Sequence, residues 1–336
     1  MKKIIYLIPL DSIGGGVEVA AKGVRNINNP LYSFNVEYIF KNKADLFDIS
    51  MMLKAVQRVY SLKPDVLILS LWRAQFVGIL FKLISPRTKI IFFVHSAEDA
   101  HFLDYFLSRL TLLISSEVWA DSATSLKERF NHSSLKINNG RVISFSARKI
   151  SKLKVKKVKP SFIFWGRVGK EKGVERAIKI FSKILKFYPN ATFTIIGSDG
   201  GTLKLVKRLC KELEIQDSVI FFNEMNFDEI EKKAANACFY LQTSLYEGAA
   251  MSVMESMKLG LVPIVTPVGE ISKYCDSSNS VLVFSDQEVA RDVIMILKNS
   301  RLYDVLSTNA SLKFKSQLTY IDSIKNSCND MIKKLF

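Results

Sequence analysis

The sequence predicts an α/β protein made of two consecutive doubly wound units, each with a parallel sheet that is covered by helices. Short, continuously apolar runs alternate with segments of helical period through almost all of the 336 residues. This alternation is interrupted once and then begins again. Because 48% of the residues are hydrophobic, a chain of this length can fill two separate cores.

The first part of the chain predicts an N-terminal Rossmann-like domain at 1–155. Strands are expected at 3–9, 34–40, 65–71, 89–95 and 117–120. Helical patterns lie near 16–27, 46–61, 73–84 and 101–114. The continuous apolar character of these strands is typical of parallel sheets that are buried on both faces.

The second part predicts another Rossmann-like domain at 160–318. Its strands are expected near 161–166, 191–197, 218–222, 238–242, 261–265 and 280–284. Its helices are expected at 173–187, 201–213, 227–235, 250–258 and 286–298. A last helix at 319–336 is expected to return to the N-terminal domain.

The segment 148–159 predicts the crossing between the two domains. It has seven basic residues in twelve and is followed by Pro160. Charges at this density repel one another and are poor material for a core, so the segment is better explained as a linker.

Basic residues exceed acidic ones in both halves of the chain. Lysine and arginine number 48 against 32 acidic residues, which gives a net charge of +16. Such an excess attracts phosphate and favours a membrane face, a phosphorylated substrate or nucleic acid as the partner. Nucleic acid is the remoter reading, because the sequence has no zinc, RRM or helix-turn-helix signature. Charge that simply keeps the protein in solution is the remaining alternative.

Cysteine and histidine usage predicts a reducing, cytoplasmic setting without a metal site. The four cysteines form no CxxC pair, and the three histidines supply no second half of a zinc site. Residues 1–11 imitate a signal peptide but lack a cleavage site, so we expect a buried first strand there. No apolar run reaches transmembrane length. We expect at most peripheral contact with an anionic membrane surface.

The segment 244–260 is the strongest candidate site. It follows the strand expected at 238–242 and opens a helix, with Glu247 before that helix and Glu255 about two turns into it. Amides around Gly248–Met251 would point at a phosphate, because the N–H groups and the dipole at a helix start favour negative charge. Judged on the spacing alone, an ordinary helix with a capping carboxylate and a solvated glutamate is the commoner explanation.

The segment 162–173 is the second candidate. A strand runs into a turn that holds three glycines, Arg167 and two lysines, and a helix follows. Glycine lets a backbone approach a ligand, and a planar guanidinium binds a diphosphate as a fork. Lys172 places a cation at the helix start, where the dipole disfavours it, and this suggests an anionic partner. A solvated basic turn is the alternative.

The glycine run Gly14-Gly15-Gly16, followed by Val17 and Glu18, is a third and weaker candidate. It comes after the first expected strand and is similar to a phosphate-cradling turn. It lacks both the GxGxxG spacing and a Walker lysine, so it does not predict NAD binding. A plain tight turn explains it equally well.

In their order along the chain, these residues resemble the retaining glycosyltransferases of family 4, which have the GT-B fold. That fold consists of two Rossmann-like doubly wound domains that face each other across a cleft. The resemblance covers most of the chain and is most specific at 160–270. The matching positions are Gly14–Glu18, Val94-His95-Ser96, Ala120-Asp121-Ser122, Asn139-Gly140, Gly166-Arg167, Lys172-Gly173, Ile196-Gly197, Glu247, Glu255 and Leu259–Val265.

This resemblance implies a nucleotide-sugar donor site mainly in the second domain. Arg167 and Lys172 would hold the diphosphate and stabilise it as it leaves. Glu247 would contact the donor sugar, and Glu255 would accept hydrogen bonds from the ribose. His95 would lie near the reacting sugar, although it could also be a strand-end histidine with a purely structural bond. The implied donor-binding set is Gly15, Gly16, Gly166, Gly197, Gly248, Ala249, Ala250, Met251 and Glu255.

The chain departs from the family pattern at two places near the expected sugar. Ala250 stands where the family usually has glycine, and Val268 stands where it often has the first of two glycines before Glu270. Both departures bear on how closely the backbone approaches the sugar. They leave the identity of the donor open.

The resemblance implies a hexosyltransferase that works with retention of configuration, without a metal and with no cofactor besides the donor. No DxD-type pair stands where a Mg²⁺ site would be expected. The basic surface and the segment 71–76 around Trp72 favour a glycan or undecaprenyl-diphosphate-linked acceptor, in bacterial surface polysaccharide assembly (O-antigen, capsule or lipopolysaccharide). Trp72 is more often a core residue than an acceptor contact. A GT-B nucleotide-sugar epimerase or a glycosyl phosphorylase is the alternative function.

Overall fold

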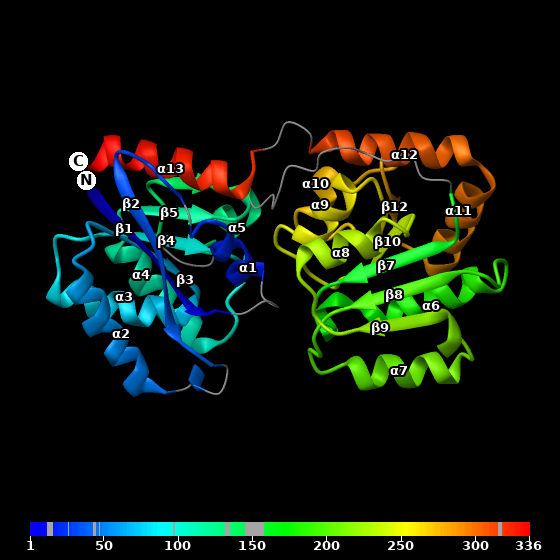
Figure 1. Cartoon of the computed structure of the whole chain (residues 1–336), viewed down its shortest axis with the longest axis horizontal. Helices are drawn as coiled ribbons and strands as arrows, with labels where there is room; N and C mark the ends of the chain where they lie inside the picture. The colour runs from blue at the N-terminus through cyan, green and yellow to red at the C-terminus, as the bar shows by residue number, and fades with distance from the viewer. Residues whose placement is uncertain are drawn as a thin grey trace. The chain divides into compact units, whose positions relative to one another are not determined.

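The chain forms two compact units (Figure 1), described by a computed structural model. The structure describes residues 1–11, 16–25, 27–42, 45–46, 48–96, 98–131, 135–144, 158–314 and 318–336. One unit comprises Met1–Ala147 together with Leu318–Phe336, and the other comprises Arg148–Gln317. The basic crossing predicted at 148–159 lies largely outside the described residues, because the description resumes at Val158.

The first unit contains a parallel six-stranded sheet in the order β2-β1-β3-β4-β5-β6. Its strands are β1 (Lys2–Leu10), β2 (Tyr32–Phe40), β3 (Val66–Ser70), β4 (Lys89–Val94), β5 (Glu117–Ala120) and β6 (Gly140–Val142). Its helices are α1 (Gly16–Gly23), α2 (Ile49–Leu62), α3 (Leu71–Ile84), α4 (Phe102–Ile114), α5 (Ala123–Glu128) and α13 (Tyr320–Leu335). In Figure 1, α13 lies along one side of this sheet, and α2 and α3 lie on the other.

The second unit has its own parallel six-stranded sheet, in the order β12-β11-β10-β7-β8-β9. The strands are β7 (Ser161–Trp165), β8 (Thr192–Ile196), β9 (Val219–Phe222), β10 (Phe239–Gln242), β11 (Val262–Val265) and β12 (Val281–Leu282). The helices are α6 (Val174–Leu185), α7 (Leu203–Glu212), α8 (Phe227–Ala234), α9 (Met251–Lys258), α10 (Ile271–Tyr274), α11 (Asp286–Lys298) and α12 (Ser300–Lys313). Short 3-10 turns lie at Lys170–Lys172 and Gln216–Ser218.

Helix α6 shows why these segments fold as the sequence predicts. Val174, Ala177, Ile178, Phe181 and Ile184 are all buried, and they recur every three or four residues along the helix. This spacing places them on one face, which packs against the sheet, while charged residues occupy the opposite face.

The prediction of two doubly wound α/β units is confirmed, but the elements expected were incomplete. Helices α5, α10 and α12 and strand β6 were not among the predicted elements. Helix α9 begins at Met251, so Glu255 lies about one turn into it and not two. Because all strands of a parallel sheet run the same way, the loops after β7, β8 and β10 meet at one edge of the second sheet.

Candidate functional site

Two loops at the carboxyl edge of the second sheet are bound to each other. The loop after β10 donates the Leu245 N–H to the Glu171 carbonyl oxygen at 2.9 Å. Thr243 donates its hydroxyl to the Gly173 carbonyl oxygen at 2.6 Å. The two candidate segments of the sequence therefore form a single structural site.

Lys172 and Glu247 form the central ion pair of this site. Lys172 Nζ lies 2.6 Å from Glu247 Oε1, and the carboxylate side chain is only 8% exposed. The same oxygen accepts hydrogen bonds from Gln242 Nε2 and from Ser244 Oγ, each at 2.7 Å. The anionic partner expected for Lys172 is therefore Glu247 of the protein itself. Three donors hold the Glu247 carboxylate in place.

Arg167 is held much more loosely. Its Nε and Nη2 atoms lie 2.9 and 2.6 Å from Glu171 Oε1, but 62% of the arginine side chain is exposed. Exposed ion pairs contribute little, about 0–1 kcal/mol, because water and salt screen them. Arg167 can therefore leave Glu171 for a better anionic partner at small cost.

Glu255 lies on α9 and is bound from the strand beneath it. Trp165, the last residue of β7, donates its indole Nε1–H to Glu255 Oε2 at 3.0 Å. Lys258 lies one turn further along; burial lowers the pKa of its amine, and the Glu255 charge opposes that shift. The carboxylate of Glu255 thus has a fixed direction relative to the sheet edge.

Ala250 has a left-handed backbone conformation, which favours glycine. Its φ and ψ are 53° and 60°, and it is the residue that precedes α9. At this departure from the family pattern, a residue with a side chain thus holds a turn conformation that favours glycine. The hydroxyl of Tyr274 donates to the Ala249 carbonyl oxygen at 3.0 Å and supports the turn from α10.

Two glycines of the site have no room for a side chain. A Cβ atom at Gly197 would lie 1.8 Å from the carbonyl oxygen of Gly166, where β7 and β8 end side by side. A Cβ atom at Gly269, which has φ +55°, would lie 2.0 Å from the carbonyl oxygen of Glu247. Gly269 thus supplies the close approach at the position where the family often has two glycines.

His95 belongs to the first unit, directly after β4. Its Nε2 lies 2.8 Å from Ser70 Oγ, and that hydroxyl lies 2.9 Å from the hydroxyl of Tyr6. Burial lowers the pKa of His95 to about 3, and the nearby positive charge of Arg129 adds to this. The imidazole is therefore neutral near pH 7. It can donate or accept hydrogen bonds, but it carries no positive charge.

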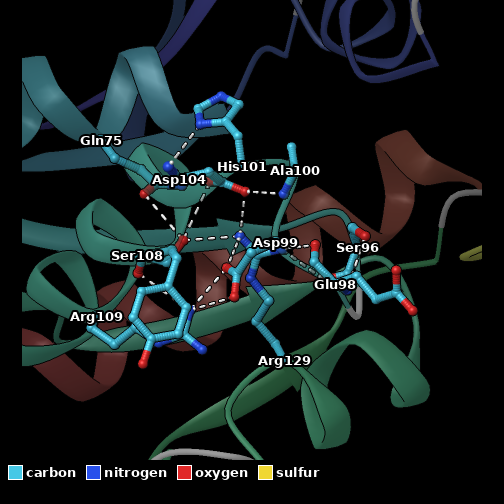
Figure 2. Close-up of polar contacts among 11 residues, drawn as sticks. Gln75, Ser96, Glu98, Asp99, Ala100, His101, Asp104, Ser108, Arg109 and Arg129 are labelled. Atoms are coloured by element: carbon cyan, nitrogen blue, oxygen red, sulfur yellow. Dashed lines mark hydrogen bonds and ion pairs between the residues drawn. The ribbon is translucent and has the colours of Figure 1, made fainter.

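A buried ionic cluster holds the loop that follows His95 (Figure 2). Arg129 Nη2 lies 2.8 Å from Asp104 Oδ2 and 2.9 Å from Asp99 Oδ1, and Nη1 donates to the carbonyl oxygen of Glu98. Arg109 pairs with Asp99 from the other side at 2.7 Å. Since Asp104 lies on α4, this cluster ties the loop to that helix.

The remaining predicted positions are less informative. Gly15 lies outside the described residues, and Gly16 is the first residue of α1. Trp72 packs against the core of the first unit, with His101 at its edge, 5.3 Å away between ring centres. Among the described residues, no group of three or more histidines, cysteines or acidic residues could hold a metal ion.

Comparison with known proteins identifies the family. The model for "Glycosyl transferases group 1" matches residues 146–313, which is half of the chain. The chain belongs to the glycosyl transferases group 1 family.

Curated relatives match about half of this chain. An uncharacterised glycosyltransferase of Methanocaldococcus jannaschii, MJ1607, is 27% identical over 172 residues, which are 50% of this chain and 43% of the relative. The poly(glycerol-phosphate) alpha-glucosyltransferase of Bacillus subtilis is 25% identical over 188 residues, or 54% of this chain and 27% of the relative. The chain thus spans less than half the length of these relatives.

Solved structures show that the group 1 chain has the GT-B fold, as the sequence predicted. The Anabaena protein Alr3699/HepE, solved in complex with UDP and glucose, superposes with a TM-score of 0.80 at 16% identity. The superposition covers 99% of this chain and 100% of that one.

Sequence analysis did not identify Tyr240 and Gln242, and it gave Ser244 and Trp165 no role although both lie in the candidate segments. Gln242 ends a strand that is otherwise apolar, and it is fully buried. A buried amide almost always has hydrogen-bond partners, so a glutamine among apolar strand residues was the available signal.

Proposed function

We propose that the protein is a glycosyltransferase that takes a sugar from a nucleotide-sugar donor bound at the carboxyl edge of the second sheet. The observation that carries this proposal is the Lys172–Glu247 pair at 2.6 Å, directly before α9. The pair supports the proposal because, next to a helix start, Lys172 could bind a diphosphate and Glu247 could bind sugar hydroxyls. The backbone from Gly248 to Met251 lies between that pair and Glu255, which would receive the ribose.

The reaction breaks the bond between the donor sugar and its diphosphate, so negative charge develops on the leaving group. Arg167, released from its exposed pair with Glu171, and Lys172 would stabilise that charge. One preorganised donor of this kind contributes about 3–4 kcal/mol to catalysis. We propose that these residues act without a metal, and that the acceptor attacks on the face that the diphosphate leaves, with retention of configuration.

A uridine diphosphate donor is the first candidate. The Anabaena neighbour was solved with UDP and glucose, which makes UDP-glucose a reasonable first probe. We propose a glycan or undecaprenyl-diphosphate-linked acceptor, in bacterial surface polysaccharide assembly. The net charge of +16 supports an acceptor that carries phosphate, and so does the poly(glycerol-phosphate) named for the Bacillus relative.

We further propose that the protein is cytoplasmic and makes peripheral contact with the anionic inner face of the cell membrane. The first turns of α4 expose Phe102, Leu103, Tyr105 and Phe106, with exposed fractions of 83%, 44%, 43% and 53%. Contiguous exposed apolar side chains mark surfaces that contact lipid or another molecule. Among the described helices, none is long and apolar enough to span a bilayer.

A ligand panel tests the donor site. We would measure the melting temperature with UDP, UDP-glucose, GDP, ADP, CMP, dTDP, NAD and a short oligonucleotide. A ligand at about 100 times its Kd stabilises the folded state by roughly 2.7 kcal/mol, which is a shift of several degrees. Stabilisation by one nucleoside diphosphate, lost in Arg167→Gln and Glu255→Gln, supports the proposal.

Matched controls are available on α7, where Arg208 and Glu212 form an exposed pair. Arg208→Gln and Glu212→Gln remove the same charges and should leave the ligand response unchanged. A response to the oligonucleotide alone would overturn the proposal and favour nucleic-acid binding. Conversion of the donor without an acceptor into an epimer or a sugar phosphate would favour an epimerase or a phosphorylase.

A further inference from the structure

Gln242 is the centre of a fully satisfied hydrogen-bond network under the proposed donor site. Its Nε2 donates to Glu247 Oε1 at 2.7 Å and to Ser244 Oγ at 3.0 Å. Its Oε1 lies 2.5 Å from the hydroxyl of Tyr240 and accepts from Ser252 Oγ at 3.0 Å. Two donors and two acceptor positions are all that a side-chain amide offers, so each is in use.

The orientation of this amide is determined by its neighbours. Turning the amide over would place Oε1 against the Glu247 carboxylate and Nε2 against two hydroxyl groups. Because a carboxylate only accepts hydrogen bonds, the arrangement with Nε2 toward Glu247 is the one that satisfies all partners. Gln242 has no exposed surface, so water cannot replace a lost bond.

The network continues from Gln242 to the second glutamate of the site. Tyr240 has a single hydroxyl proton, which it donates to Gln242 Oε1, so it meets Trp165 through ring contact. The two rings meet edge to face with centres 4.5 Å apart, and the hydroxyl oxygen lies 3.2 Å from the Trp165 carbonyl oxygen. Trp165 in turn donates its indole N–H to Glu255. Glu247 and Glu255, which lie eight positions apart in the sequence, are thus joined through the side chains of β7 and β10.

We propose that Gln242 is a positioning residue that sets the direction of Glu247 and, through Tyr240 and Trp165, links it to Glu255. The inference rests on the proposed function, since it assigns the two glutamates to the sugar and ribose ends of one donor. All three bonds to Glu247, from Lys172, Ser244 and Gln242, end on Oε1. Three donors on one oxygen restrain the direction of the Glu247 carboxylate.

The isosteric variant Gln242→Glu gives the sharpest test, because it changes charge and keeps shape. At low pH the new carboxyl group is protonated and donates to Glu247 as the amide did. As the pH rises the group loses its proton, and two carboxylates at hydrogen-bond distance repel each other. The titratable groups around this network are Lys172, Glu247, Glu255, Lys258, Glu270, Tyr240, Tyr274 and Cys275.

We would measure the Kd of UDP-glucose and of UDP by calorimetry from pH 6 to pH 9. If another donor and its diphosphate bind the parent protein more tightly in the panel, that pair replaces them. For Gln242→Glu we expect an affinity for the sugar nucleotide near that of the parent at pH 6 and a loss of at least tenfold at pH 9. The loss for UDP should be smaller, because UDP lacks the sugar that Glu247 contacts. The control Gln216→Glu adds the same charge at an exposed turn and should follow the parent at every pH.

The link to Glu255 has its own test. Trp165→Phe keeps an aromatic side chain, although a smaller one, and removes the indole N–H donor, so we expect weaker binding of UDP. In the double variant Trp165→Phe/Gln242→Glu at pH 9, the change in binding free energy should differ from the sum of the changes in the two single variants. If the parent protein binds UDP-glucose and Gln242→Glu shows the parent's pH profile, the positioning role is wrong while the proposed function stands.

Should Gln242→Glu fail to fold, Ser244→Ala removes one donor from Glu247 with a smaller change. It should then weaken UDP-glucose more than UDP; equal effects on both ligands would overturn the inference. If the parent binds neither ligand and no other sugar nucleotide, the proposed function itself fails.

Discussion

Ala250 holds a backbone conformation that alanine rarely adopts. Its φ of 53° brings Cβ close to the following carbonyl oxygen, which costs roughly 1–2 kcal/mol for a residue other than glycine. Ala250→Gly should remove this strain, less the greater chain entropy that glycine loses on folding. We expect the free energy of unfolding to rise by up to about 1 kcal/mol, measured by urea unfolding.

Ala235 provides the matched control for this substitution. It is exposed and has φ −57°, where alanine is unstrained. Ala235→Gly should lower stability by at most about 0.5 kcal/mol, because Ala235 is the C-cap residue of α8 and glycine costs less at a helix end than in its interior. A loss of stability in both variants would contradict a strained Ala250.

His95 should make the first unit sensitive to acid. Burial lowers its pKa to about 3, below the ordinary value of 6.5, so the folded state keeps the ring neutral. Below pH 6.5 the unfolded chain binds a proton that the folded chain does not. Stability is therefore lost as the pH falls, by up to about 2 kcal/mol between pH 7 and pH 5.

The variant His95→Gln removes this titration and can keep a hydrogen bond to Ser70. Its urea-unfolding free energy should fall less than that of the parent between pH 7 and pH 5. Parallel losses in the two proteins would mean that His95 titrates as it does in the unfolded chain.

Single residues mark how far the sequence could predict this site. Glu247, Glu255, Arg167 and Lys172 were identified because charge and spacing are visible in a sequence. Their hydrogen-bond and ion-pair partners were not identified. Lys172 and Glu247 are 75 positions apart, and they meet only because the sheet brings their two loops together. The conformation of Ala250 was hidden for the same reason, since alanine itself indicates a right-handed helix.

At the scale of elements, apolar runs predicted every strand except β6, but helices α5, α10 and α12 were missed. Helix α12 contains Ser300, Ser307, Thr308, Asn309 and Ser311, which are typical of loops. It forms because Tyr303, Leu306 and Ala310 are buried against α9 and β11. Tertiary burial decides such a segment, and the local pattern does not show it.

The loop after β4 should depend strongly on Arg129. The arginine side chain is 5% exposed and pairs with Asp99 and Asp104 (Figure 2). Removing one partner of a buried ion pair leaves charge without compensation and costs about 3–5 kcal/mol. Arg129→Gln should lower the stability of the first unit by about 3 kcal/mol, with the largest gain in hydrogen exchange at the start of α4.

Breaking an exposed pair of the same chemistry is the comparison. Arg208→Gln removes the partner of Glu212, where both side chains are more than half exposed. The expected cost is below about 1 kcal/mol. Similar costs for the two variants would show that the buried cluster adds nothing beyond a surface ion pair.

At the scale of the whole molecule, the first unit is built from two separate stretches of the sequence. Helix α13 follows the second unit in sequence and belongs to the first. Tyr32 of β2 donates its hydroxyl to the Lys325 carbonyl oxygen, and Asn29 donates to Asn329 at 2.9 Å. The first unit therefore completes its core with the last residues of the described chain.

The unit to which a helix belongs predicts which unit a substitution in its core face will destabilise. Ile324 on α13 has no exposed surface, and Ile296 on α11 is 3% exposed. Truncating a buried isoleucine to alanine costs about 2–5 kcal/mol. Ile324→Ala should increase hydrogen exchange in β1 and β2 and leave β7 and β8 protected. Ile296→Ala should do the reverse, since it lies in the core of the second unit.

Because Ile324 is only 10 residues beyond Phe314 of the second core, a response of β7 and β8 to Ile324→Ala would show that the chain unfolds as one cooperative unit.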